Sequence, residues 1–383
     1  MLAWGIAECE RGCRSPLDGL AFLRNDGPVT NRVQVLSEPF GKLPSGAEVT
    51  RYQLVHPTGA SVSIIEYGAI ITSIVMPDRH GALSPITAGY GSLEGYLADT
   101  AFLGAVVGRY ANRIAAGRFC LDGTSYQLPQ NQATNHLHGG PEGFYRKLWK
   151  SRAFSDESGA TVELSLHSPD GDAGYPGALE VQVRYRFDAS LCLSVEYEAR
   201  STKPTVLNLT QHSYFNLGGS GGVLDHELRI CGERFTPTDA LAIPTGVIAP
   251  VAGTALDFRS WRRIGEGIDS EEPQIQMAQG YDHNFVIDGT PGELRLAAEL
   301  RCSQSGRHLT VRTTEPGMQF YSGNFLPRSS RGLAHAPSHG YREALCLETQ
   351  HYPDSPNQPE FPSTRLDVGQ VFRSKTEYAC SVN

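Results

Sequence analysis

The sequence lacks several features that would direct a protein to a membrane, to nucleic acid or out of the cell. None of its apolar runs approaches the roughly 20 residues that a membrane-spanning helix needs. No basic run stands out that would follow a phosphate backbone, and acidic residues outnumber basic ones by 41 to 33. The N-terminus has no basic start followed by a sustained apolar core, so it does not resemble a secretory signal. We therefore expect a soluble cytoplasmic protein that binds neither membranes nor nucleic acid.

The sequence has eight cysteines, and they are scattered rather than clustered. Only Cys9 and Cys13 lie close together, and without a second pair or a flanking histidine they do not make a convincing zinc site. Isolated cysteines that are buried as small apolar residues are a simpler interpretation than a disulfide framework. Scattered thiols in a chain of 383 residues fit a reducing compartment.

No internal repeat, low-complexity segment or long Pro, Ser and Gly linker divides the chain. Residues 1–32 show no sustained periodicity and carry mixed charge, so we predict a poorly ordered N-terminal extension there. A chain of this length is long enough for two domains, although all-β chains of similar length often fold as one domain. We predict that residues 33–383 form a single domain.

Short alternating segments favour β-strands from about residue 48 onward. The clearest is LEVQVRYRF (179–187), in which apolar and aromatic residues share one face and charged or amide residues share the other. Turn-forming residues follow at 188–190, and the alternation resumes over 191–197. The two runs therefore predict a hairpin of half-buried antiparallel strands.

Comparable alternation occurs in residues 62–78, with a break at Gly68, and in the segments 161–166, 293–300 and 308–314. No window carries a long amphipathic helical stripe with caps. The 41 glycines and 24 prolines, together with many aromatic residues, suit a chain of many short strands. We predict an all-β fold built as a large antiparallel β-sandwich.

Two titratable residues are candidates for acid–base chemistry. His212 lies in LNLTQHSYFNLGG (207–219), and a fixed imidazole can give or take a proton near neutral pH. A buried histidine bonded to a neighbouring carbonyl is the structural alternative. Glu348 follows the apolar run 344–347, and a carboxylate at the end of a buried strand is either paired or functional, because an unpaired buried charge is costly.

Asn112 and Arg113 lie in a stretch of otherwise small and apolar residues, GRYANRIAAGRF (108–119). A guanidinium group can donate two parallel hydrogen bonds to paired hydroxyls or to a carboxylate. The alternative is a structural arginine that forms an ion pair with a buried acid. Asp282, in GYDHNFVID (280–288), is a further candidate, although aspartate often makes only a local turn bond.

His136 and His138 are two residues apart, a spacing that puts both on one face of a strand and would suit a metal. A zinc site needs further ligands, however, and His138 runs directly into Gly139 and Gly140. That arrangement is expected where backbone and side chain approach a ligand closely. We predict no metal site.

Five motifs together resemble the aldose 1-epimerase, or galactose mutarotase, family. They are LHGG (137–140), HSYFNL (212–217), DHNF (282–285), QFYSGNFL (319–326) and LETQHYPD (347–354), and their order and approximate separations also agree. The resemblance runs from about residue 36 to about residue 378. It implies a galactose mutarotase-like supersandwich and an isomerase that interconverts the α and β anomers of free aldohexoses such as glucose and galactose, without a cofactor.

The same resemblance implies roles for the matching residues. Glu348 would be the base that takes the proton from the anomeric hydroxyl, and His212 the acid that protonates the ring oxygen, on opposite sides of the sugar. The polar lining would be completed by His138, Asp282, Asn112, Arg113 and Gln319. The same motifs also contain aromatic residues, and because side chains alternate along a strand, some of these must point into the core. They include Tyr214, Phe215, Phe285, Phe320 and Tyr321.

The sequence departs from the family pattern at two places, and two alternative functions are also considered. Gln211 stands before His212, where the family often has Asn, and the N-terminal extension has no counterpart in the family core. A hexose-phosphate mutarotase would need clustered cations at the pocket mouth. A non-catalytic carbohydrate-binding protein would be expected to lose the acid or the base. The chain is expected to be a monomer or a homodimer, and the preferred aldose does not follow from the sequence.

Overall fold

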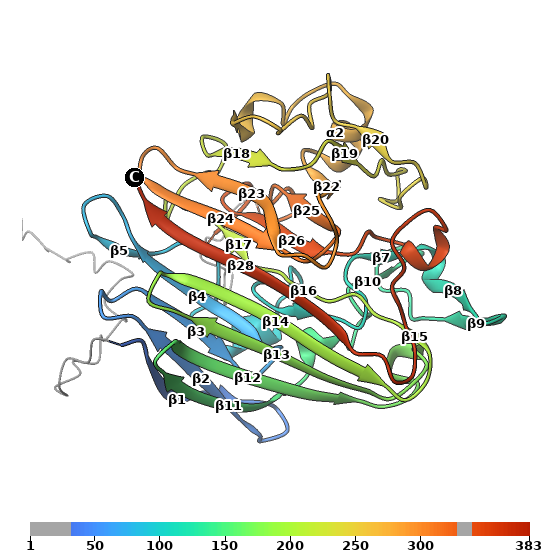
Figure 1. The fold of residues 1–383 in the computed structure, drawn as a ribbon, viewed down its shortest axis with the longest axis horizontal. Helices are drawn as coiled ribbons and strands as arrows, with labels where there is room; N and C mark the ends of the chain where they lie inside the picture. The colour runs from blue at the N-terminus through green and yellow to red at the C-terminus, as the bar shows by residue number, and fades with distance from the viewer. Residues whose placement is uncertain (1–31, 328–338) are drawn as a thin grey trace, which may run out of the picture. The chain divides into compact units, whose positions relative to one another are not determined.

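The computed structural model describes residues 32–327 and 339–383, and the compact unit to which they belong runs from Arg32 to Asn383. The predicted N-terminal extension, with Cys9 and Cys13, lies outside the described residues apart from Arg32. Within the described part, the chain is mostly β-strand, and the pairs formed by its named strands are antiparallel (Figure 1).

The largest sheet has nine strands. In spatial order they are β11 (Lys150–Asp156), β12 (Gly159–Ser168), β13 (Leu179–Phe187), β14 (Cys192–Ser201), β28 (Phe372–Val382), β24 (Arg307–Thr313), β23 (Arg295–Arg301), β18 (Glu227–Ile230) and β21 (Arg262–Arg263). The hairpin predicted from residues 179–197 is the pair β13 and β14, and the segments 161–166, 293–300 and 308–314 lie within or overlap β12, β23 and β24.

Two smaller sheets complete the main framework. The five-stranded sheet holds β1 (Gln34–Lys42), β2 (Glu48–Val55), β3 (Ser61–Ile65), β4 (Ile70–Pro77) and β5 (Leu83–Pro85). The six-stranded sheet holds β17 (Tyr214–Phe215), β26 (Leu345–Gln350), β25 (Gly317–Tyr321), β22 (Asp282–Val286), β19 (Arg234–Phe235) and β20 (Ala249–Pro250). The predicted break at Gly68 separates β3 from β4, where Gly68 has φ +64°.

Four two-stranded sheets lie outside these three sheets. They are β6 (Val106–Val107) with β16 (Thr210–Gln211), β7 (Arg113–Ile114) with β10 (His136–Leu137), β8 (Arg118–Leu121) with β9 (Thr124–Gln127), and β15 (Thr205–Val206) with β27 (Arg365–Leu366). The α-helices of the described residues are short, α1 (Leu93–Leu97) and α2 (Pro273–Ala278). Neither is long and apolar enough to cross a membrane.

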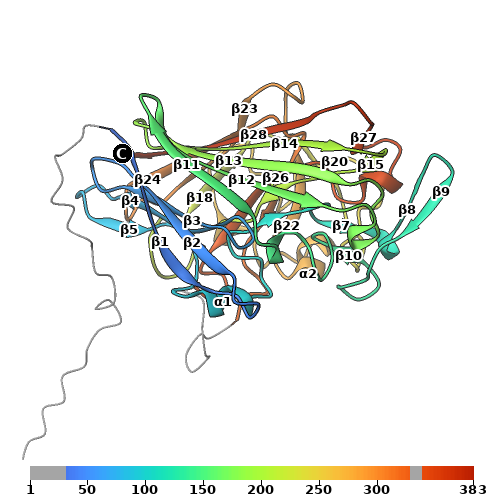
Figure 2. The same cartoon turned by 90° about the horizontal axis from the view of Figure 1, so that it is seen from below.

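The main core lies between the nine-stranded sheet and the two smaller sheets. The inward side chains of β13 are buried, as the alternation predicted, and they pack in one cluster with side chains of β4, β25 and β26. Figure 2 shows β12, β13, β14 and β28 as one layer above β2, β3 and β22. The predicted all-β, antiparallel sandwich is therefore confirmed.

The six-stranded sheet divides its side chains between this core and a second face. In β26, Leu345 and Leu347 join the main core, whereas Cys346 and Glu348 point to the other side, because side chains alternate along a strand. Strand β25 repeats the pattern, with Phe320 in the main core and Tyr321 outside it. Polar side chains of neighbouring strands thus converge on one face of this sheet.

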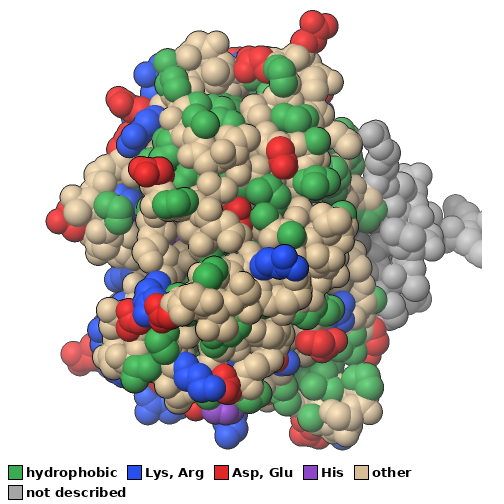
Figure 3. Space-filling model, turned by 90° about the vertical axis from the view of Figure 1, so that its right-hand side faces the viewer, with side chains coloured by type: hydrophobic (Ala, Val, Ile, Leu, Met, Phe, Trp, Pro, Cys, Tyr) green, Lys and Arg blue, Asp and Glu red, His purple; other side chains and the backbone are tan. Residues whose placement is uncertain are grey.

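On the face drawn in Figure 3, Lys and Arg side chains are interspersed with Asp and Glu side chains, so this face carries no patch of a single charge. A mixed surface of this kind does not favour the tracking of a nucleic-acid backbone across that face.

Candidate active site

A cavity of about 290 Å³ lies on the second face of the six-stranded sheet. This volume is close to the lower limit of small-molecule pockets, roughly 300–1,000 Å³, and suits a monosaccharide. Its polar lining consists of carboxylates, imidazoles, one guanidinium group and amides: Asp99, Asp282, Glu348, His138, His212, Arg113, Asn112 and Gln132.

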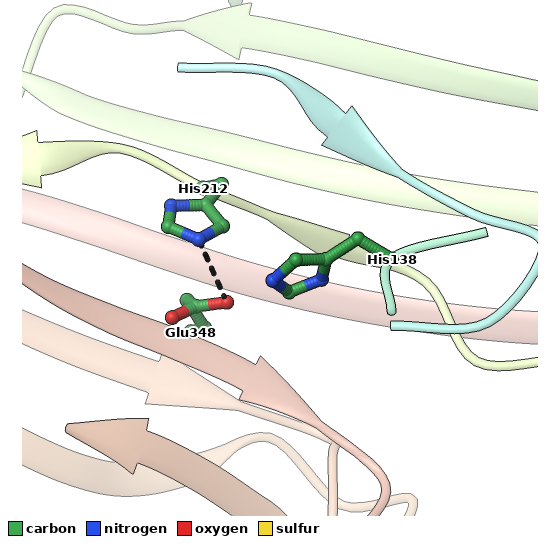
Figure 4. A group of neighbouring side chains, drawn as sticks. All are labelled: His138, His212 and Glu348. Atoms are coloured by element: carbon green, nitrogen blue, oxygen red, sulfur yellow. Dashed lines mark ion pairs between the residues drawn. The ribbon is translucent and has the colours of Figure 1, made fainter. Parts of the chain in front are cut away.

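His212 and Glu348 meet at the wall of this cavity. Glu348 comes from β26, and His212 follows β16, where its backbone N–H donates to the carbonyl of Ala105 and its carbonyl accepts from Gly104. The Nε2 atom of His212 lies 3.5 Å from Oε2 of Glu348 (Figure 4). Both residues are at most 4 % exposed, so the contact is shielded from bulk water.

Burial acts in opposite directions on the pKa values of this pair. It lowers the pKa of His212 to about 4, because desolvation disfavours the imidazolium ion. It raises the pKa of Glu348 well above its usual range; the neighbouring Asp282 carboxylate adds to this shift, and Arg113 opposes it. These opposite shifts favour placing the proton that the two groups share on the carboxyl group.

The distance also corrects one expectation. A sugar ring cannot lie between two groups that are 3.5 Å apart, so His212 and Glu348 do not flank a sugar from opposite sides. Adjacent placement is compatible with the chemistry, because the anomeric hydroxyl oxygen and the ring oxygen are bonded to the same carbon.

His138 has its proton position fixed by the backbone. It follows β10 in a left-handed conformation, with φ +52°, and its Nδ1 accepts a hydrogen bond of 3.1 Å from the backbone N–H of Asn112. An amide N–H can only donate, so the proton of the neutral imidazole must be on Nε2. Burial, with smaller effects of His212, Arg113 and His136, holds the pKa of His138 well below its usual value. His138 is thus a neutral donor at the cavity wall.

Arg113 is oriented by three neighbours. Its Nε donates to Oε1 of Gln132 over 2.6 Å, and its Nη1 donates to Oδ1 of Asn112 over 3.4 Å. Its Nη2 lies 3.9 Å from the carboxylate of Asp282. The carboxylate contact is the longest of the three, so Arg113 is held mainly by amide groups.

Gln319 lies behind Asp282 rather than at the cavity wall. Its Nε2 donates to Oδ1 of Asp282 over 2.6 Å, and it stands opposite Glu348 in the register of β25 and β26. Its Oε1 is buried without a hydrogen-bond partner among the described residues, as is Oε2 of Glu348. Oε1 of Gln319 is therefore an unsatisfied acceptor beside the cavity, whereas Oε2 of Glu348 faces Nε2 of His212.

Aromatic rings enclose the imidazole of His212. Tyr214 stacks on it with ring centroids 5.0 Å apart, and Phe102 lies at 5.9 Å with an interplanar angle of 29°. Phe102 also meets His138 edge to face at 4.6 Å, and it has φ +59°, a strained conformation for a bulky residue. Of the aromatic residues named from the sequence, Tyr214 and Tyr321 line the cavity, and the main core holds Phe215, Phe285 and Phe320.

Residues 50–379 match the family model described as aldose 1-epimerase. The chain belongs to the aldose 1-epimerase family. It is therefore an isomerase that acts in the mutarotation of aldose sugars, and the predicted family, enzyme class and activity are confirmed.

Known members of the aldose 1-epimerase family resemble the chain over most of its length. The human protein described as galactose mutarotase is 43 % identical over 348 residues, which cover 90 % of this chain and 97 % of the human one. The Escherichia coli protein described as aldose 1-epimerase is 37 % identical, over 90 % of this chain and 99 % of its own. A crystal structure of galactose 1-epimerase from Lactobacillus acidophilus superposes with a TM-score of 0.81 at 29 % identity, covering 92 % of this chain and 99 % of that one.

Within this epimerase cavity, the structure brings together six of the seven residues named from the sequence, and Gln319 stands directly behind them. Gln211, at a departure from the family pattern, is buried; its amide donates to the carbonyl of Gly104 and its Oε1 accepts from the N–H of Ser213. Gln211 thereby holds the loop that precedes β6 in place, and this loop lies next to His212.

Several lining residues of the epimerase cavity escaped the sequence analysis, among them Asp99, Phe102 and Gln132. Asp99 accepts hydrogen bonds from the backbone of Ala101 and Leu103 and from the hydroxyl of Tyr90, and so shapes the loop that carries Phe102. The available signals were weak: Gln132 lies in a polar stretch just before LHGG, and Phe102 lies shortly before GRYANR.

His136 and His138 do not share a ligand. The ring nitrogens of His136 contact the carbonyl of Pro129 and the hydroxyl of Tyr175, at 2.7 Å each, whereas His138 leaves β10 and lines the cavity. The strand ends at Leu137, so the expected common face does not form.

Distance alone would allow a metal ion between His138, His212 and Glu348, whose ligand atoms lie within 4.8 Å of one another. Two imidazoles and a carboxylate are a known donor set for zinc. A metal would need the lone pair of Nε2 of His138, because Nδ1 is already bonded to Asn112, and that Nε2 carries the proton. The trio is therefore better suited to hydrogen bonding and proton transfer.

Proposed function

We propose that this epimerase interconverts the α and β anomers of free galactose and glucose in the cavity, with Glu348 as the base and His212 as the acid. The observation that carries the proposal is the 3.5 Å contact between Nε2 of His212 and Oε2 of Glu348, two buried groups whose pKa values are shifted in opposite directions. Pairs of titratable groups in such environments are typical of acid–base sites.

Ring opening begins when one proton moves across this contact and leaves a carboxylate on Glu348 and an imidazolium on His212. Glu348 then takes the proton from the anomeric hydroxyl, and the oxygen electron pair forms the carbonyl bond at C1. The bond between C1 and the ring oxygen breaks, and the ring oxygen takes its electron pair and the Nε2 proton of His212. The product is an open-chain aldehyde beside a carboxylic acid and a neutral imidazole.

Closure reverses these transfers after rotation about the bond between C1 and C2. The hydroxyl on C5 attacks the other face of the carbonyl carbon, His212 takes the hydroxyl proton, and Glu348 returns a proton to the carbonyl oxygen. No net proton is gained or lost in the cycle. Acid and base assistance is typically worth ~10²- to 10⁴-fold each.

The remaining polar residues bind and orient the sugar. Nε2–H of His138 donates to a hydroxyl oxygen, and the Arg113 guanidinium and Asp282 carboxylate supply a donor and an acceptor on neighbouring strands. The unsatisfied Oε1 of Gln319 accepts from a hydroxyl that reaches past Asp282. A sugar hydroxyl both donates and accepts, so a lining that mixes amides, an imidazole and charged groups suits it.

The charge of the cavity favours a neutral sugar over a hexose phosphate. Among the described residues of the lining, Arg113 is the single Arg or Lys, and it stands among the carboxyl groups of Asp99, Asp282 and Glu348. A phosphate would meet three acidic groups for one cation, which is unfavourable in a site with little water.

The cell context is a further part of the proposal. We place the activity in the cytoplasm, and the six cysteines in the described residues, which are all free thiols, support a reducing compartment. Residues 33–383 are proposed to act as one catalytic domain, as a monomer or a homodimer, with a free sugar as the partner and without nucleic acid.

Polarimetry tests the substrate class directly. Freshly dissolved α-galactose and α-glucose should reach equilibrium faster with the protein than without it, whereas a hexose 6-phosphate should relax at its uncatalysed rate. Faster relaxation of the phosphate alone would overturn the free-sugar assignment. If sugars bind without any acceleration, the protein is a carbohydrate-binding module.

A further inference from the structure

Every side of the His212 imidazole has a defined neighbour. Its Nε2 edge faces Glu348, the rings of Phe102 and Tyr214 stack with it, and the ring of His138 meets it edge to face. The remaining edge belongs to Cys346, whose Sγ lies 3.5 Å from Nδ1. Cys346 and Glu348 are two residues apart on β26, so strand alternation places both on the same face and against the same ring.

We propose that Cys346 is a positioning residue for the mutarotation reaction: its sulfur accepts the Nδ1–H of His212, so that Nε2 is the nitrogen that exchanges a proton with the sugar. This inference rests on the proposed roles of His212 and Glu348. In that cycle His212 alternates between an imidazolium and an imidazole that lacks only the Nε2 proton. Nδ1 therefore keeps its proton throughout, and its partner must be an acceptor.

The choice of sulfur has a chemical consequence. A thiol is a weak acceptor compared with a carbonyl or carboxylate, the partners that commonly hold Nδ1–H in enzymes. A carboxylate in this place would stabilise the imidazolium and make it a poor acid. The Cys346 contact orients the ring while leaving the imidazolium acidic enough to protonate a ring oxygen.

The protonation state of Cys346 agrees with this role. Burial, aided by the nearby Glu348 and Asp282 carboxyl groups, raises the pKa of the thiol well above its usual value, so no thiolate competes for the proton. The titratable groups that face His212, or that lie next to its partner Glu348, are Glu348 and Cys346 from β26, Tyr214 from β17, His138 after β10, Asp282 from β22 and Arg113 from β7.

Two substitutions of Cys346 test the proposal. Cys346→Ala removes the sulfur that faces Nδ1–H, and we expect kcat to fall about tenfold, the effect of roughly one hydrogen bond, while KM changes less than about twofold. Cys346→Ser offers an oxygen acceptor, so we expect kcat to stay within about threefold of wild type and the pKa of His212 to rise above its value of about 4. The Cys302→Ala variant removes a buried thiol that lies outside the cavity lining and should match wild type.

The decisive readout is nitrogen-15 NMR of His212, which reports its tautomer and its pKa separately from activity. A protonated Nδ1 in wild type and a mixture of tautomers in Cys346→Ala would support the inference. An unchanged tautomer and pKa in both Cys346 variants would overturn it, whatever happens to kcat. The outcome is independent of the proposed function, which fails instead if Glu348→Gln keeps normal activity.

Discussion

Oε1 of Gln132 accepts a hydrogen bond of 2.6 Å from Nε of Arg113 at the wall of the cavity. This bond turns the other two nitrogens of the guanidinium toward Asn112 and Asp282. The planar fork of arginine has fixed donor directions, so the partner of Nε decides where Nη1 and Nη2 point. Gln132 thus contributes to sugar binding through the orientation of Arg113.

Gln132→Ala should weaken substrate binding more than turnover. Loss of the Nε acceptor frees the guanidinium to rotate, and we expect KM for galactose to rise about threefold to tenfold while kcat stays within about threefold, the net scale of one ordinary hydrogen bond. Initial rates by polarimetry give both constants. Gln130→Ala is a close control, because Gln130 bonds to the carbonyl of Ala116 and does not line the cavity. An equal rise of KM in both variants would refute the role of Gln132.

Glu348→Gln should abolish most activity. The amide cannot take the anomeric proton, and we expect kcat to fall by at least ~10²-fold, with sugar affinity within a few-fold of wild type. His212→Asn should cost a comparable factor, and the double variant should cost little more than the worse single one, because the two groups act as a unit. The exposed Glu360→Gln controls for protein quality. Near-normal turnover by Glu348→Gln would remove Glu348 as the base.

The same substitution should stabilise the fold at high pH. The pKa of Glu348 in the folded protein lies well above that of an unfolded chain, so the folded state binds more protons in the interval between the two values, and stability is lost as the pH rises through it. The amide that replaces the carboxyl group has no charge to bury, so Glu348→Gln should have a higher Tm than wild type at pH 8 and a smaller advantage at pH 5. Calorimetry at the two pH values gives the comparison, and a lower Tm for the variant at pH 8 would contradict the raised pKa.

Strand alternation was the part of the fold that the sequence could predict. The faces of β13 follow from the order of residues 179–187, and the division of Tyr214 from Phe215 and of Tyr321 from Phe320 follows the same rule. Period-two alternation is a local property, so it can be recognised without knowledge of which strands pair.

The parts of the site that escaped prediction depend on tertiary geometry. Phe102 reaches His138 and His212 because of its left-handed backbone, and nothing in the surrounding sequence indicates that conformation. The distance between His212 and Glu348 depends on how β16 approaches the six-stranded sheet, and the expectation of opposite sides was accordingly wrong. Gln319 is on the face of β25 that looks toward the cavity, as predicted. Its side chain bonds to Asp282, which lies between it and the cavity.

Removal of divalent metal should leave the rate unchanged. The amide N–H of Asn112 keeps the proton of His138 on Nε2, so a metal between His138, His212 and Glu348 would have to displace that proton. Polarimetric rates before and after dialysis against a chelator should agree within error, and added zinc should not restore or increase activity. A loss of activity that zinc reverses would show that the trio binds a metal and would replace the acid–base scheme.

Acid should destabilise this protein through its buried histidines. Burial lowers the pKa of four of them to about 4: His136, His212, His226 and His283. An unfolded histidine has a pKa near 6.5, so these groups bind more protons in the unfolded chain between pH 4 and 6.5, and their contribution to the free energy of unfolding falls as the pH falls through that window. The raised pKa of Glu348 contributes a slope of the opposite sign. Each group changes the slope by up to about 1.4 kcal/mol per pH unit.

Urea unfolding at pH 7, 6 and 5 measures this slope, and a matched pair of variants assigns it. His283→Asn removes one buried imidazole, so its free energy of unfolding should depend less steeply on pH than that of wild type, even if the substitution lowers stability at every pH. His80 is exposed, and His80→Asn should keep the wild-type slope. If His283→Asn keeps the wild-type slope, the pKa of His283 in the folded protein is not below that of an unfolded histidine, and the effect of its burial is refuted.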